Sequence, residues 1–146
     1  MALTDSGEPA VWSTTHPSFT VFNSQLETFA SVWVPFDTDF SAFHDAAAPV
    51  LAEHAAATEF FPVGMPPANS FDVSSLPWTS FTGFTLNIDG GSRHLAPIFT
   101  LGRYVEREGR TFLPVALQIH HAAADGFHAS QLLNDLGLLL NDPSWL

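Results

Sequence analysis

Apolar residues along this chain follow two spacings, and the shorter one predicts a set of β-strands. Runs rich in β-branched and aromatic residues, or alternating between apolar and polar positions, are typical of strands. The predicted strands cover residues 18–23, 28–34, 81–88, 97–105 and 112–121. The pair Gly90 and Gly91 is expected to end the third of them, and the polar stretch 106–110 predicts a hairpin loop between the last two.

Helical spacing appears in two places. From Asp39 to Thr58 the apolar residues recur every three or four positions, with Thr38 or Asp39 available as the N-cap. Pro49 falls inside this stretch, and because an interior proline costs about 3 kcal/mol, two short helices are the alternative. The second helix follows Asp125, which can cap it, and a leucine-rich pattern carries it toward the C-terminus.

The strand, turn and helix around His121 form the first candidate for chemistry. Along 112–121 the period of two places His121 at the end of the apolar face, next to a turn of small residues and the helix that begins at Gly126. A histidine there could act as a general base. It could equally be a buried histidine bonded to the backbone, with Asp125 only a cap.

A metal site is a third possibility for the same segment. It would use His120, His121, Asp125 and His128. Adjacent histidines on a strand point to opposite faces, so this possibility is the weakest of the three, and we expect no metal.

Charge and composition limit the classes of molecule that this chain is expected to bind. Fifteen acidic residues against four arginines and no lysine give a net charge of −11, which argues against binding nucleic acid or an anionic membrane. No cysteine, secretory signal or transmembrane span is present, so we expect a cytoplasmic protein. The arginines are Arg93, Arg103, Arg107 and Arg110. This region either binds a polyphosphate ligand or carries solvated charges beside a hairpin.

Residues 120–128, His-His-Ala-Ala-Ala-Asp-Gly-Phe-His, resemble the HHxxxDGFH signature of chloramphenicol acetyltransferases. Further short stretches resemble the same family in the same order: 17–22, 27–29, 60–62, 74–78, 84–87 and 96–100. The resemblance implies an α/β fold, a two-layer sandwich of mixed sheet and helices, in one domain over 1–146. It also implies a homotrimer with active sites between subunits.

The resemblance further implies a reaction and its residues. Acetyl-CoA would be the co-substrate, His121 the general base for an acceptor hydroxyl, and Ser74 the oxyanion donor, with Ser75 beside it. Asp125 would orient the histidine turn through an N-terminal arginine, which is absent here. The acceptor pocket would draw on Phe29, Phe61, Phe84 and Leu86, and coenzyme A would contact Thr100, Arg103 and Tyr104.

The resemblance covers only the C-terminal two-thirds of a usual family domain, so we expect the chain to be N-terminally truncated. Chloramphenicol is the first acceptor to test. The alternative is a non-catalytic remnant or self-associating module of the same fold, because missing strands would leave a sheet edge and apolar faces uncovered.

Overall fold

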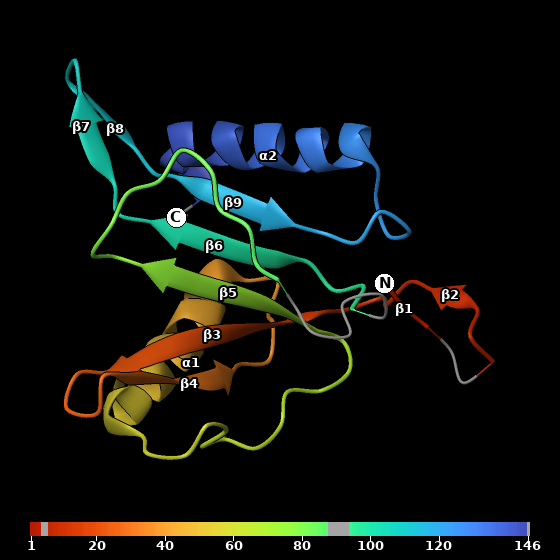
Figure 1. Cartoon of the computed structure of the whole chain (residues 1–146), viewed down its shortest axis with the longest axis horizontal. Helices are drawn as coiled ribbons and strands as arrows, with labels where there is room; N and C mark the ends of the chain where they lie inside the picture. Colours follow the sequence, from red (N-terminus) through yellow and green to blue (C-terminus); the bar gives the residue numbers. More distant parts are fainter. Residues whose placement is uncertain (4–5, 88–93, 146) are drawn as a thin grey trace.

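A five-stranded mixed sheet forms the centre of the protein in a computed structural model that describes residues 1–3, 6–87 and 94–145 (Figure 1). Its strands are β3 (His16–Asn23), β4 (Thr28–Trp33), β5 (Ser70–Leu76), β6 (Ile98–Gly102) and β9 (Val115–Gln118). They lie in the order β4-β3-β5-β6-β9. The pairs β3–β5 and β5–β6 are parallel, whereas β3–β4 and β6–β9 are antiparallel.

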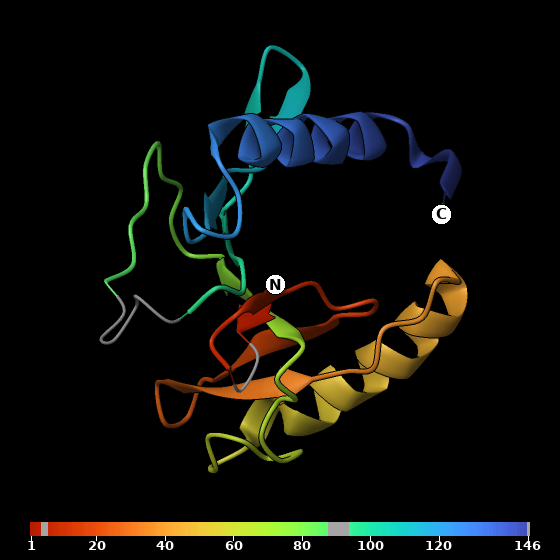
Figure 2. The same cartoon turned by 90° about the vertical axis from the view of Figure 1, so that its right-hand side faces the viewer.

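Two helices and two small hairpins complete the fold. The helical elements are α1 (Phe40–Glu53), η1 (His54–Ala56), α2 (Gly126–Asn141) and η3 (Pro143–Trp145). The small sheets pair β1 (Ala2–Leu3) with β2 (Pro9–Ala10) and β7 (Val105–Arg107) with β8 (Arg110–Phe112). Figures 1 and 2 show α1 behind the β3–β5 half of the sheet and α2 alongside β9. The predicted α/β class is confirmed.

Helix α1 passes through Pro49 without a break, so the alternative of two short helices is wrong. Asp39 begins it, as predicted, by accepting a hydrogen bond from the Ala42 N–H at 2.9 Å. Proline removes one N–H donor from the ladder. The Ala-rich sequence around it keeps the remaining turns, and the last turn tightens into η1.

The strand prediction was right for β3 and β4 to within two residues but wrong for the middle of the chain. Residues 81–87 form no strand; Ile88, Gly90 and Gly91 lie outside the described residues. The strand in this part of the sheet is β5, formed by 70–76 and not predicted. Strand propensity depends on neighbours, and this serine-rich segment gains parallel partners on both sides, in β3 and β6.

The predicted hairpin after β6 is present, but the expected loop over 106–110 is wrong in extent, because β7 and β8 take up most of it. The predicted strand over 97–105 ends at Gly102, before this hairpin. Strands β7 and β8 pair beyond β6 and β9, and the turn between them uses Glu108 at φ 52° and Gly109 at φ 72°. Two successive positive φ values fit the tight turn that matches strand twist. Strand β9 ends at Gln118, so the predicted strand over 112–121 stops three residues before His121.

Strand register gives the sheet two unlike faces. In neighbouring strands, residues in register point to the same side, so Thr20, Ser74 and Thr100 share one face. Ser18 and Asp72 belong to that face as well, and so do the apolar residues Phe22, Phe29 and Ile98. The buried apolar side chains are Ala30, Val32, Val34, Ala47, Leu95 and Ile98. No side chain of α2 is buried.

Candidate active site

The turn between β9 and α2 is held by His120. Its carbonyl oxygen accepts hydrogen bonds from Ala123 N–H at 2.8 Å and Ala124 N–H at 3.2 Å. Its imidazole Nδ1 accepts another from Ala122 N–H at 3.1 Å. A nitrogen that accepts carries no proton, so the ring of His120 is fixed by the turn it helps to form.

His121 is more exposed than His120. It lines a cavity of about 440 Å³ together with Leu86, His94, Gln118 and His120 itself. Within the described residues the His121 imidazole makes no hydrogen bond. Both ring nitrogens are therefore available to a ligand in the cavity.

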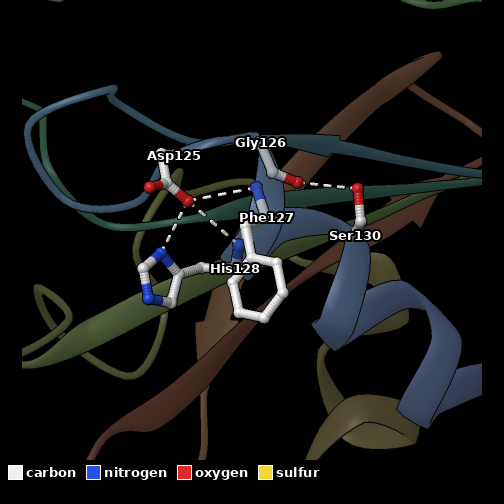
Figure 3. Close-up of polar contacts among 5 residues, drawn as sticks. All are labelled: Asp125, Gly126, Phe127, His128 and Ser130. Atoms are coloured by element: carbon white, nitrogen blue, oxygen red, sulfur yellow. Dashed lines mark hydrogen bonds and ion pairs between the residues drawn. The ribbon is translucent and has the colours of Figure 1, made fainter.

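Asp125 caps helix α2 with a single carboxylate oxygen, as Figure 3 shows. Oδ1 accepts from Phe127 N–H at 3.0 Å and His128 N–H at 3.1 Å, and it lies 2.7 Å from His128 Nδ1. The hydrogen bond from the His128 backbone, followed by that from its ring, lowers the pKa of Asp125 below its ordinary value. No arginine pairs with Asp125 among the residues described, so His128 is its side-chain partner there.

Ser74 lies on the central strand β5 and lines a second cavity, of about 340 Å³. Predicted residue Phe29 lines the same cavity, as do Thr20, Phe22 and Trp78. The Thr20 hydroxyl donates a hydrogen bond to Ser74 Oγ at 3.1 Å. Thr20 was missed by the sequence analysis, because only the β3–β5 register brings it next to Ser74.

The two proposed catalytic side chains do not meet within one copy of the chain. His121 lines one cavity and Ser74 lines the other, and no residue lines both. Of the predicted acceptor residues, Leu86 lines the His121 cavity and Phe29 the Ser74 cavity. Four of the predicted residues are thus divided between two cavities, with His121 and Leu86 at one and Ser74 and Phe29 at the other.

Phe61 and Phe84 line neither cavity. The Phe61 ring packs against Phe60 at a centroid distance of 4.5 Å, and the Phe84 ring packs against Phe81 at 5.4 Å. Leu86 is held at the His121 cavity through its backbone, whose N–H donates to Gln118 Oε1 at 3.0 Å.

The three predicted coenzyme A residues lie on β6 and directly after it. Thr100 is 2% exposed and pairs in register with Ser74. Arg103 and Tyr104 are exposed, and Arg103 N–H donates to Thr79 O at 2.7 Å. Arg93 lies outside the described residues.

A second polar pair that sequence reasoning missed lies beside the His121 cavity. His94 Nε2 is 3.9 Å from Asp72 Oδ2, too far for a hydrogen bond, and is buried without a partner in the described part of the chain. Partial burial raises the pKa of Asp72, and nearby His94 acts in the opposite direction. Within the described residues, no group of three or more His, Cys, Asp or Glu side chains is arranged to hold a metal ion.

A family model described as chloramphenicol acetyltransferase matches residues 1–137. The chain is 66% identical over its full length to the chloramphenicol acetyltransferase of Streptomyces acrimycini, and 40% identical over 140 residues to that of Bacillus pumilus. It spans 66% and 64% of the lengths of these two relatives.

Two solved structures have a similar fold. A chloramphenicol acetyltransferase superposes with a TM-score of 0.75 at 23% identity, over 86% of this chain and 61% of the other. The dihydrolipoamide acetyltransferase of Azotobacter vinelandii gives a TM-score of 0.72 at 23% identity, over 97% and 60%. No helix within the described residues is long and apolar enough to cross a membrane.

Proposed function

Because this chain belongs to the chloramphenicol acetyltransferase family, we propose that it moves an acetyl group from acetyl-CoA to a hydroxyl of a small molecule. Chloramphenicol is the first acceptor to test. The observation that carries the proposal is the difference in hydrogen bonding between the adjacent histidines. Both line the same cavity, but the His120 ring accepts a hydrogen bond from the turn, whereas the His121 ring makes none in the described residues.

In the proposed reaction, His121 removes the proton from the acceptor hydroxyl as its oxygen attacks the thioester carbonyl. The tetrahedral intermediate carries a negative oxygen, to which the Ser74 hydroxyl donates a hydrogen bond. Collapse of this intermediate breaks the carbon–sulfur bond. The proton held by His121 then passes to the sulfur of the departing coenzyme A, and acetylated acceptor remains.

Asp125 is proposed to orient the histidine turn without contacting substrate. It ties the end of the turn to the first turn of α2 through three contacts to one oxygen. A displacement of about 1 Å at a reacting group can lower a rate roughly 10²-fold, so the position of this turn matters for His121.

The separation of His121 from Ser74 supports a site shared between copies. One copy's His121 cavity would face another copy's Ser74 cavity, in a homotrimer with three such sites.

Ligand contacts are proposed from both cavities. The acceptor ring would lie against Phe29, Phe61, Phe84 and Leu86, brought together only when two copies meet. Coenzyme A would approach Arg103 and Tyr104 beside the arginines of the β7–β8 hairpin, and would reach Thr100 next to its partner Ser74. We propose a cytoplasmic location for the reaction, as expected from the sequence.

Thiol release from acetyl-CoA in the presence of chloramphenicol, measured alongside acetylated product, tests the reaction. A mixing experiment then tests the shared site. His121→Ala and Ser74→Ala chains should each keep about 1% of wild-type activity or less, but co-refolded mixtures should recover about one quarter of it if the residues come from different copies. Mixtures that stay inactive, while wild-type chain refolded alone is active, contradict the shared site.

One observation favours a different outcome, a self-associating module without turnover. The C-terminal half of α2 exposes Leu138, Leu139 and Leu140 by 71, 52 and 54%. A folded, oligomeric sample that releases no free thiol and consumes no acetyl-CoA would support that alternative over the enzyme.

A further inference from the structure

Thr20 and Ser74 form a hydroxyl pair across the two central parallel strands. The register joins Phe19 to Val73, which puts the next residues, Thr20 and Ser74, side by side on the same face of the sheet. Thr20 Oγ1 is the donor and Ser74 Oγ the acceptor, 3.1 Å apart. Both side chains line the same cavity of about 340 Å³.

The direction of this hydrogen bond decides what Ser74 can do. A hydroxyl has one proton to donate and two lone pairs to accept with. Because Ser74 accepts from Thr20, its own proton is not used in the pair and is available to a group in the cavity. A donor of this kind is required wherever negative charge develops on a substrate oxygen.

Thr20 is also well placed to hold a fixed geometry. It lies within β3, where Ser31 of β4 is its register partner and the neighbouring residues pair with β5. Threonine is branched at Cβ and stiff at χ1, so its hydroxyl direction varies less than that of a loop serine.

A second hydroxyl pair on the same sheet face provides an internal comparison. Ser18 Oγ and Ser31 Oγ are 2.8 Å apart, and the two residues are 2% and 9% exposed. Neither of them lines the Ser74 cavity. This pair satisfies buried polar groups, whereas Thr20 and Ser74 lie at a cavity wall formed largely by Phe22, Phe29 and Trp78.

We propose that Thr20 is a positioning residue for Ser74: by donating to Ser74 Oγ it aims the serine proton into the cavity, where the acyl oxygen of the substrate becomes negative. This inference rests on the proposed acetyl transfer. Thr20 acts through Ser74 and need not touch the substrate. Its effect therefore belongs to the transition state, where the oxyanion forms, and not to substrate binding.

Two substitutions at the same position isolate the hydroxyl. Thr20→Val keeps the shape and removes the donor, whereas Thr20→Ser keeps the donor and removes a methyl group. We expect Thr20→Val to lower kcat roughly three- to tenfold with KM nearly unchanged, the range set by one hydrogen bond. Thr20→Ser should recover most of that loss. Ser31→Ala, which breaks the Ser18–Ser31 pair, should lower stability but leave kcat near wild type.

A double-mutant cycle shows whether Thr20 acts through Ser74. Ser74→Ala should lower kcat on the order of 10²-fold or more, and adding Thr20→Val should then lower it no further. Equal kcat for Thr20→Val and wild type overturns the inference, as does an unrelieved loss in Thr20→Ser. A Thr20→Val effect of the same size with and without Ser74 also overturns it.

The four proteins of this cycle are wild type, Thr20→Val, Ser74→Ala and the double variant. They separate a failure of this inference from a failure of the proposed function. Wild-type chain without turnover, or Ser74→Ala with full turnover, contradicts the proposed function or the role of Ser74. Urea unfolding then still measures the contact: the midpoint shifts of Thr20→Val and Ser74→Ala should not add in the double variant. Fully additive shifts would show that no hydrogen bond joins the two side chains, and would overturn the inference without any activity.

Discussion

At the scale of single residues, the two adjacent histidines differ in what their rings already do. His120 Nδ1 accepts from the turn, and His121 has no hydrogen bond in the described residues. We therefore predict that His121→Ala lowers kcat about 10²–10⁴-fold, the usual range for a lost general base, while circular dichroism stays unchanged. His120→Ala should instead lower the unfolding midpoint and reduce kcat less. Equal losses of kcat with equal stabilities would contradict these roles.

Asp125 gives a prediction with a defined pH dependence. Its pKa is lowered in the folded chain, so ionised Asp125 stabilises the fold above about pH 4, the ordinary aspartate pKa. That contribution is lost as pH falls through the lowered folded-state pKa. Asp125→Asn keeps a capping oxygen and removes the charge. Urea unfolding of both proteins should show a gap in stability at pH 6 that closes toward pH 2; a gap independent of pH would contradict the prediction.

Asp72 should behave in the opposite way. Partial burial raises its pKa, so the ionised carboxylate costs stability at neutral pH, and this cost disappears as pH falls and the group becomes protonated. We predict that Asp72→Asn has a higher melting temperature than wild type at pH 7, with the difference shrinking toward pH 4. Melting curves at both pH values check this. A lower melting temperature at pH 7 would mean that the attraction to His94 outweighs burial.

At the scale of elements, packing around β6 is tight where the 81–87 segment crosses it. A Cβ added to Gly102 would lie 2.9 Å from Phe81 Cε1 and 3.2 Å from Pro114 Cβ. Gly102→Ala should therefore destabilise the protein by about 1–3 kcal/mol, as overpacking typically does. Gly137, inside α2, has open space around it, so Gly137→Ala is the matched control and should stabilise by about 0.5–1 kcal/mol.

Chemical denaturation of the two alanine variants measures both effects. If Gly102→Ala is as stable as wild type, Phe81 must move without cost, and its ring does not hold the 81–87 segment against β6. A loss in Gly137→Ala would instead indicate that α2 packs against a further surface in solution.

At the scale of the whole molecule, exposed leucines and a net charge of −11 act against each other in association. Apolar contact along α2 favours association, and charge repulsion opposes it until salt screens the charges. We predict a larger mass by light scattering at about 0.5 M salt than at about 0.05 M, and a smaller increase in Leu138→Gln. Exposed Gln131 in the same helix provides the control, as Gln131→Ala should match wild type. If the mass measured by light scattering changes neither with salt nor with Leu138→Gln, association through α2 is contradicted.

The sequence by itself determined the helix starts and the first strand pair, because these depend on residues only a few positions apart. Asp39 and Asp125 begin their helices because a side-chain oxygen caps N–H groups two or three residues away. Strands β3 and β4 are joined by a short turn and follow from their own residue types. The segment 120–128 likewise carried the family resemblance that the family model bears out.

Only the tertiary structure decided which middle segment enters the sheet and which side chains meet. Residues 70–76 become a strand because β3 and β6 pair with them, whereas the more strand-like 81–87 has no such partners in the described chain. The same register brings Thr20, 54 positions away in sequence, to Ser74. It also separates Ser74 from His121, which no pattern along the chain indicated. Caps and tight turns depend on neighbours a few residues apart, but sheet order and cavities depend on backbone hydrogen bonds between distant segments, which the order of residues does not display.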